Sequence, residues 1–340
     1  MATYRVESRL RDGTYVAALP YRNLQYELGW NKSYGIRFEL PLYHQAVTWA
    51  TLTPALHEIW VWRNGTLITC GPLWDATPSS ESASISCNAQ NLLDYFDVRL
   101  IGDAEYNVID QVNIAWDLIA DSQALTGGGL NIVAGTLDTG ITRSAKWIKF
   151  DNKYILEAIT DFSEMTDGFD FYINPSTRAF HARYPRPQVD RGLTLVWKKH
   201  IRRYSVQFMG KYLRNTVRVS ATEPNYAEAV DTTSRTTYGL REYGDTYRDA
   251  PTASELSDYA SKLRDKRKDV KNYPTVMIDP SVIDIFDPNV IQYGDKVRII
   301  INDGYVNIDQ QYRYITAQVS VDKQGAETVV IYLQDLREVN

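Results

Sequence analysis

Hydrophobic and polar residues alternate along much of the first hundred positions, which is the pattern of half-buried β-strands. Residues 34–40 alternate strictly and place Ile36, Phe38 and Leu40 on one face. Apolar segments at 59–63 and 66–70 flank Asn64-Gly65, a pair that tolerates positive φ at both central positions of a two-residue turn. We therefore predict a β-hairpin here, ended by Gly71-Pro72, within a small barrel or sandwich of short strands.

The period of the pattern changes near residue 102. Apolar residues then recur at helical spacing and predict an amphipathic helix over about 104–121, namely Val108, Val112, Ala115, Trp116 and Ile119. A second helix should begin near Asp151 or Asn152, with an apolar stripe of Ile155, Ala158, Ile159 and Phe162. Strands at 169–173 and 179–184, joined by a turn at 174–177, complete an α+β unit.

Strand patterns return from Leu193 onward, at 193–197, 204–208, 216–221, 296–301, 312–321 and 328–333. The polar stretch at about 223–250 predicts a long loop or arm. A helix should follow over about 252–271, with Thr252-x-x-Glu255 as a capping box. The predicted fold class is mainly β with an α+β insertion. Two barrel-like β domains, at 1–102 and 189–340, flank a two-helix α+β domain at 103–188.

Composition and charge argue against some classes of protein. The 340 residues carry a net charge of −5, which argues against a dedicated nucleic-acid-binding protein. No run of 18 apolar residues and no signal-peptide core occurs, so no membrane span is expected. The 24 Tyr, 8 Trp and 9 Phe suit a β-rich protein with large contact surfaces, and they also suit sugar binding.

Catalytic motifs are missing from the sequence. The four histidines, His44, His57, His181 and His200, match no zinc pattern, and Gly127-Gly128-Gly129 lacks the residues of a phosphate loop. Acid pairs such as Asp167 with Asp170, or Asp284 with Asp287, stand in turn contexts. We therefore assign no catalytic, cofactor-binding or metal-binding residues, and expect a protein that is not an enzyme and needs no cofactor.

Three features leave alternatives open. The basic run at 262–268 is a solvated helix side or a phosphate- or partner-binding face. Trp60 and Trp62 share a strand face, which is a core or interface stripe or a sugar platform. Cys70 and Cys87 are two buried reduced thiols, or they bridge neighbouring strands.

Three segments carry a family resemblance. Residues 59–73 resemble the "strand, Arg-Asn-Gly, strand, Gly-Pro" hairpin of siphophage minor tail proteins of the Gp37-like family. Residues 89–101 resemble the exit from the first domain of such proteins, and 290–299 is similar to their "x-Gly-Asp-x-Val" strand entry. By layout the resemblance covers nearly the whole chain.

The resemblance implies a structural hub at the tail tip, or baseplate, of a long-tailed phage. Three copies would form a pseudo-sixfold ring, a homotrimer that continues the DNA ejection conduit. Implied partners are the distal tail or tail tube protein, the tape measure protein, and receptor-binding or fibre proteins, with phage DNA passing without sequence-specific binding. The chain would be made in the host cytoplasm and reside in the virion.

The chain ends soon after its last predicted strand, so we expect no appended C-terminal peptidase, lysozyme or fibre. Two alternatives to the hub remain. One is a carbohydrate-binding tail or adhesion protein that uses its Tyr and Trp surface. The other is a cell-wall hydrolase built on paired carboxylates.

Overall fold

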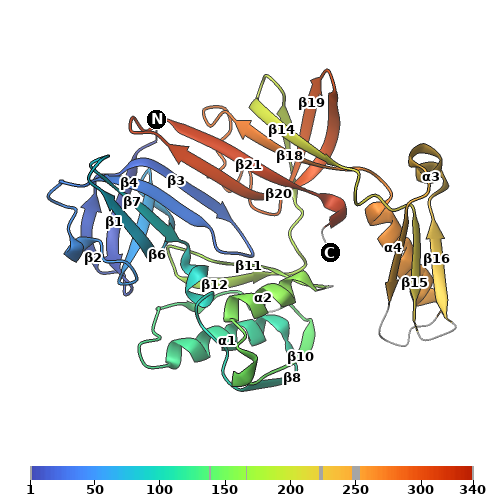
Figure 1. The fold of residues 1–340 in the computed structure, drawn as a ribbon, viewed down its shortest axis with the longest axis horizontal. Helices are drawn as coiled ribbons and strands as arrows, with labels where there is room; N and C mark the ends of the chain where they lie inside the picture. The colour runs from blue at the N-terminus through green and yellow to red at the C-terminus, as the bar shows by residue number, and fades with distance from the viewer. Residues whose placement is uncertain (1, 138, 166, 222–224, 247–252, 339–340) are drawn as a thin grey trace.

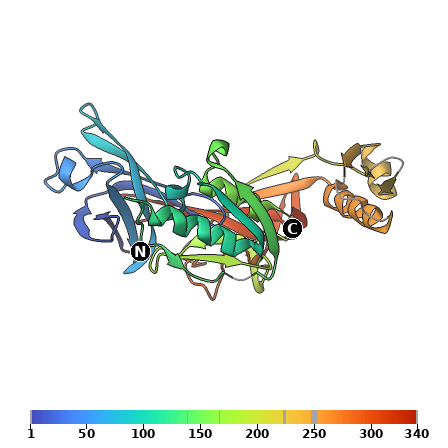
Figure 2. The ribbon, with the colours of Figure 1, turned by 90° about the horizontal axis from the view of Figure 1, so that it is seen from below.

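The computed structural model describes residues 2–137, 139–165, 167–221, 225–246 and 253–338. A sheet of thirteen strands dominates these residues, and three small sheets and four α-helices surround it. The molecule is elongated, with an α+β unit below the large sheet and a small unit projecting at one end (Figures 1 and 2). The mainly β fold class with an α+β insertion is confirmed.

The N-terminal part supplies seven strands in the order β3-β4-β7-β6-β5-β1-β2. They are β1 (Tyr4–Leu10), β2 (Tyr15–Leu19), β3 (Arg22–Gly29), β4 (Gly35–Pro41), β5 (His57–Arg63), β6 (Thr66–Ser79) and β7 (Ser84–Gln90). The predicted hairpin is confirmed, because Arg63 pairs with Thr66 across Asn64 and Gly65, whose φ angles are 50° and 81°.

The prediction that Gly71-Pro72 ends the second strand is wrong. Strand β6 continues to Ser79, and its partner changes from β5 to β7 at this point. A Cβ on Gly71 would lie 2.2 Å from the carbonyl oxygen of Gln90, so only glycine permits this close approach of two backbones. The glycine therefore allows β6 to pair first with β5 and then with β7.

The C-terminal part supplies the other six strands of the large sheet. They are β13 (Asp190–Val196), β14 (Ile201–Met209), β18 (Lys271–Ile278), β19 (Lys296–Asp303), β20 (Val306–Val321) and β21 (Glu327–Asp335). In the described residues, the ends of β13 and β14 are joined only by an isolated bridge between Trp197 and Ile201. No strand ladder joins β13 to β14 in these residues.

Strand β20 joins the two β-rich parts. Its first half pairs with β19, and its last six residues lie between β21 and β3, in register from Thr316 with Gly29 to Val321 with Leu24. The N- and C-terminal strands therefore share one hydrogen-bonded sheet. The boundaries at 102/103 and 188/189 stay predictions.

The α+β unit contains two helices, α1 (Gln111–Ala124) and α2 (Ile155–Glu164). Its strands are β8 (Ala104–Asp110), β9 (Val133–Ala134), β10 (Thr142–Trp147), β11 (Asp170–Ile173) and β12 (Ala179–Arg183). The two strands predicted at 169–173 and 179–184 are confirmed and pair antiparallel.

Both predicted helix starts in this unit are wrong. Residues 104–110 form β8, which pairs with β10, and α1 begins only where the Asp110 side chain accepts a hydrogen bond from Val112 N at 2.9 Å. Helix α2 begins at Ile155, because Lys149–Asp151 forms a 3₁₀ turn and Asn152 takes a left-handed φ of 50°.

The stretch predicted as a long arm at 223–250 is ordered into regular elements in its described residues. They are β16 (Tyr226–Val230), α3 (Thr232–Tyr238) and β17 (Glu242–Thr246). Strands β16 and β17 flank β15 (Thr216–Ser220) in a three-stranded sheet. Helix α4 (Ala253–Arg267) covers one face of this sheet. The loop prediction is wrong because these strands bury small or few side chains, which leaves the sequence polar. Thr252 of the proposed capping box lies outside the described residues.

Helix α4 ends earlier than the predicted residue 271, since Lys271 already pairs with Met209 as the first residue of β18. We call β15, β16, β17, α3 and α4 the outlying unit. The chain leaves the large sheet after β14 to form this unit and returns to it in β18 (Figure 1).

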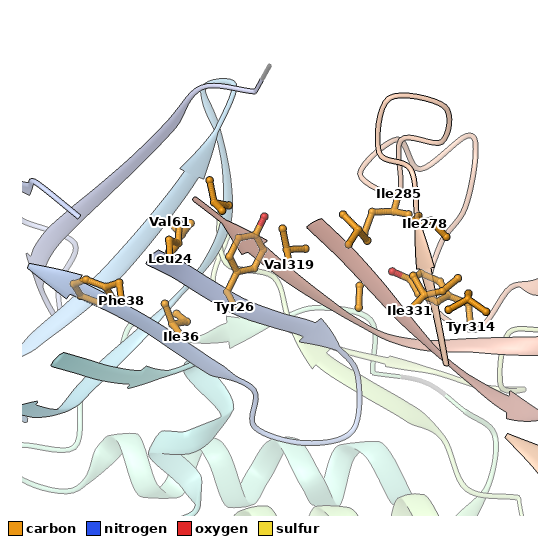
Figure 3. Close-up of a cluster of buried hydrophobic side chains, with 14 of the residues drawn as sticks. Leu24, Tyr26, Ile36, Phe38, Val61, Ile278, Ile285, Tyr314, Val319 and Ile331 are labelled. Carbon is orange, nitrogen blue, oxygen red and sulfur yellow. The ribbon is translucent and has the colours of Figure 1, made fainter. Parts of the chain in front are cut away.

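The main core lies along the large sheet and unites both β-rich parts. Leu24, Tyr26, Ile36 and Phe38 from the N-terminal strands lie in the same buried cluster as Val319 and Ile331 from β20 and β21 (Figure 3). A second core fills the α+β unit, and a small third core lies in the outlying unit. One large core shared by both parts explains how a single sheet can hold strands from both ends of the chain.

Candidate functional site: buried junctions and exposed surfaces

The four histidines each bind a backbone amide, His44 and His200 in turns and His57 and His181 in strands β5 and β12. In each, Nδ1 accepts a hydrogen bond from a backbone N–H, at 2.9–3.2 Å, from Ala46 to His44, Thr53 to His57, Thr136 to His181 and Val196 to His200. Burial lowers the pKa of His181, which also stacks on Tyr172. The described residues contain no group of three or more His, Cys, Asp or Glu side chains placed to hold a metal ion.

Cys70 and Cys87 are free and buried, which confirms the prediction of two reduced thiols. Burial raises the pKa of both thiols above the usual value, so neither is poised as a nucleophile. Trp60 and Trp62 also act structurally, because both pack against the second core and each indole N–H donates to a glutamate, Glu58 and Glu7 respectively.

Asp170, one of the sequence-predicted acids, is fully buried at the junction of all three parts of the molecule. Arg313 of β20 donates to it, Arg186 lies 3.8 Å away, and Asn31 of the loop after β3 donates to it at 2.8 Å. A carboxylate held in this way cannot take part in general acid–base catalysis without first losing its partners. The residue is therefore a cross-link between the α+β unit and both β-rich parts.

The other predicted acids are not assembled into a catalytic pair. The side chain of Asp167 accepts a 3.5 Å hydrogen bond from Tyr184, and within the described ranges it makes no ion pair. Asp284 lies 3.7 Å from Arg63, and Asp287 accepts turn hydrogen bonds from Asn289. The structure thus leaves these four acids in structural roles.

A second buried ion pair links the α+β unit to the N-terminal strands. Arg178 donates two parallel hydrogen bonds of 2.9 Å to Glu58 of β5, and Tyr95 donates to the same carboxylate at 3.0 Å. Glu58 is fully buried and Arg178 is 8% exposed. Bidentate geometry of this kind is the strongest form of ion pair, and it fixes the orientation of the hairpin that carries Arg178.

A third junction joins the first strand to the last. Glu327 of β21 accepts hydrogen bonds from Arg63 at 2.7 Å and from Tyr4 at 2.5 Å, and Tyr4 also contacts the hydroxyl of Tyr26. Burial by itself would raise the pKa of Glu327, but these hydrogen bonds outweigh it and hold the pKa below its usual value. The carboxylate therefore stays charged at neutral pH.

Sequence reasoning missed these junctions. Arg178, Arg186 and Arg313 belong to no motif. Arg178 and Arg313 meet their acids only because the fold brings distant segments together, and Arg186 approaches Asp170 from the loop after β12. Of the residues at these junctions, sequence analysis singled out only Asp170, and it did not identify the arginines that bind this acid.

Exposed aromatic and aliphatic side chains form the candidate surfaces for partner proteins. Tyr43 and Trp49 stand on the long loop between β4 and β5, with 79% and 75% exposure. A second group surrounds the start of the α+β unit and comprises Val98, Leu100, Ile148, Phe150 and Tyr154. A third is the edge-to-face pair of Phe208 and Tyr305 beside the β19–β20 turn. Apolar surface of this kind is typical of protein contacts.

The basic run at 262–268 is partly used inside the outlying unit. Lys268 pairs with Asp231 and Asp265, and the Arg267 guanidinium lies 3.9 Å from the ring centroid of Tyr243. These contacts hold α4 to the sheet. Within the described ranges, no helix has the length and apolar character needed to cross a membrane.

Solved structures of phage tail proteins have folds similar to that of this chain. The 43 kDa tail protein of prophage MuSo2 from Shewanella oneidensis is 12% identical, with a TM-score of 0.72 over 98% of this chain and 99% of that one. The tail protein from Neisseria meningitidis is 12% identical, with a TM-score of 0.67 over 99% of this chain and 98% of that one.

A third solved structure is the Escherichia coli c3393 protein, a type VI secretion component described as structurally similar to T4 phage tail proteins gp27 and gp5. It is 8% identical, with a TM-score of 0.54 over 97% of this chain and 78% of that one. No family model and no curated protein matches the chain. The chain thus has the fold of phage tail proteins, along its whole described length.

Proposed function

We propose that this chain is a structural, non-enzymatic component of a phage tail, and that it forms the hub of the tail tip, or baseplate, of a long-tailed phage. The observation that carries the proposal is the fold likeness over almost the full length of two tail proteins. Fold alone does not define function, but here the candidate catalytic acids are also locked in buried or turn contacts.

The proposed assembly is a homotrimeric ring. The two β-rich parts of one subunit share a continuous sheet, so three subunits would offer six comparable β-rich blocks to a sixfold tail tube. Permanent interfaces of this class bury about 2,000 Å² or more. The exposed aromatics Trp49, Phe150 and Tyr305 are the residues we expect to lie in contacts with neighbouring subunits or tail proteins.

The proposed partners are the distal tail or tail tube protein, the tape measure protein, and receptor-binding or fibre proteins. Phage DNA would pass through the ring without sequence-specific binding. The net charge of −5 agrees with passage of DNA without retention, because net negative charge repels phosphate.

Two measurements test the proposal. Light scattering on the purified chain should give three times the mass of 38.9 kDa, and an image of the intact particle should place the chain at the tail tip. A stable monomer that binds a glycan with micromolar affinity would overturn the hub in favour of a carbohydrate-binding adhesion protein. Clearing of a peptidoglycan suspension by the chain would instead favour a cell-wall hydrolase.

A further inference from the structure

A pocket of about 410 Å³ lies where the α+β unit meets the two β-rich parts. Its walls come from the end of β3 with Trp30, from β6 at Thr66–Cys70, from Asn91–Leu93 after β7, from the β11–β12 hairpin at Tyr172–Ser176, and from the loop before β19 at 285–293. Its volume falls in the range of about 300–1,000 Å³ that is typical of ligand pockets, and such pockets favour junctions between units.

The pocket runs along the edge of a strand. Side chains of successive strand residues point to opposite faces, yet five consecutive residues of β6, Thr66–Cys70, line the pocket. A pocket that contacts all five reaches residues of both faces, as a pocket along the strand edge does. On its other edge this stretch pairs with β5, and β6 meets β7 only from Leu73 onward. The edge that faces the pocket has no strand neighbour in the described residues, and the 3₁₀ turn Leu92–Phe96 packs against β6 and contributes Leu92 and Leu93 to the same pocket.

The pocket walls combine apolar surface with two charges. Leu67, Ile285 and Ile291 are buried apolar residues of the wall, and Trp30 stacks on Tyr172 at a centroid distance of 5.2 Å. Glu27 and Arg183 also line the pocket. Neither has an ion-pair partner within the described ranges, in contrast to Glu58, Asp170 and Arg313 nearby.

We propose that this pocket binds an extended peptide segment of a partner protein, which adds to the free edge of β6 as a further strand. The peptide backbone would hydrogen-bond to the strand edge, alternate apolar side chains would enter the pocket, and an acidic and a basic side chain would pair with Arg183 and Glu27. Only the identity of the partner as another tail protein rests on the proposed function, because the pocket chemistry is independent of it.

Terminally blocked nine-residue peptides test the proposal on the full chain. One peptide carries Lys, then alternating Val and Thr, then Glu. A second has Lys and Glu exchanged, and a third replaces both with Gln. Fluorescence anisotropy should show that one charge order binds at least about tenfold more tightly than the other two, as expected for charge-assisted contacts.

Variants of the pocket sharpen this test. The double variant Glu27→Arg with Arg183→Glu should reverse the preference between the two charged peptides. Glu81→Gln and Arg203→Gln alter exposed charges away from the pocket lining and serve as controls that leave binding unchanged. A preference that does not reverse would overturn the proposed charge pairing.

Backbone pairing is tested by methylating alternate amides of the tighter peptide. A peptide bound as an edge strand turns only one set of amides toward β6, so one methylated form should bind and the other should not. Equal binding by both forms, loss with both forms, or occupation of the pocket by an oligosaccharide such as chitotriose in place of the peptides would overturn the inference. A particle image that places the chain elsewhere than in a tail would overturn the proposed function and leave these binding results intact.

Discussion

The outlying unit is stabilised differently from the rest of the molecule, namely the large sheet with the α+β unit, which we call the body. In the body, 33 buried apolar residues form one cluster along the large sheet, and buried carboxylates such as Glu58 and Asp170 link its parts. In the outlying unit only five described apolar residues are fully buried, and the pair of Arg218 with Glu228 is exposed to solvent.

This difference in the size of the two cores predicts different local stabilities for the body and the outlying unit. A core of five residues cannot offset by a wide margin the ordering cost of a unit that runs from Thr216 to Arg267, so the outlying unit should open locally before the body does. The body, with its shared sheet, should behave as the rigid frame. A unit of low local stability at one end of a rigid frame suits a contact element that orders fully in an assembly.

The largest expected effect is in the body. Arg178→Met would leave Glu58 buried without its partner, and it should lower the free energy of unfolding by about 3–5 kcal/mol. Urea denaturation followed by tryptophan fluorescence measures this loss. The control is Arg218→Met in the outlying unit, which removes an exposed pair and should change stability far less. An equal loss of unfolding free energy in both variants would contradict the proposed difference between the body and the outlying unit.

The second prediction compares the loss of stability from truncating two buried aliphatic side chains, Ile331 and Leu256, which are each 1% exposed. Ile331→Ala in the body and Leu256→Ala in the outlying unit should each cost about 2–5 kcal/mol in the region that contains them. Hydrogen exchange should show faster exchange throughout the body for the first variant. For the second it should be faster only from β15 to α4, and a uniform increase would mean that the unit is not independent.

Acid should weaken the body through Glu327. The folded pKa of this group lies below the ordinary value of 4.5, so its contribution is present above that pH and is lost as the pH falls through the folded pKa. The melting temperature should therefore fall between about pH 5 and pH 3. Glu327→Gln should flatten this part of the curve, and an unchanged slope would contradict the role of the junction.

The smallest effect is expected from removing the outlying unit. Met209 and Lys271 pair across the β14–β18 ladder, so an Asn-Gly turn can join the two strands directly. The shortened chain should melt within a few degrees of the full one, and calorimetry measures this. A collapse in stability would show that contacts such as Arg337 with Asp269 matter more than the comparison suggests.

Local patterns determined much of the secondary structure. The hairpin at Asn64-Gly65 follows from turn chemistry alone, and the strands around residues 174–177 follow from alternation beside a turn. The mainly β class with an α+β insertion follows from the order of these patterns. All of this depends on interactions between residues close together in the chain.

Errors arose where tertiary contacts outweigh local preference. Residues 104–110 have helical spacing, yet they form β8 because β10 offers them a strand partner. The polar 223–250 stretch contains strands because β15 and α4 cover its few buried side chains. In both cases a partner distant in sequence supplies the deciding hydrogen bonds.

The sequence by itself determined the class of fold, the central hairpin and the absence of recognisable catalytic motifs. Only the tertiary structure decided that β3 and β20 merge both β-rich parts into one sheet, and that Glu58 and Asp170 meet arginines more than a hundred residues away. It alone also left one edge of β6 open to a pocket. The physical reason is that turns and helix caps are local, whereas strand pairing and buried charge pairing depend on which segments the whole chain brings together.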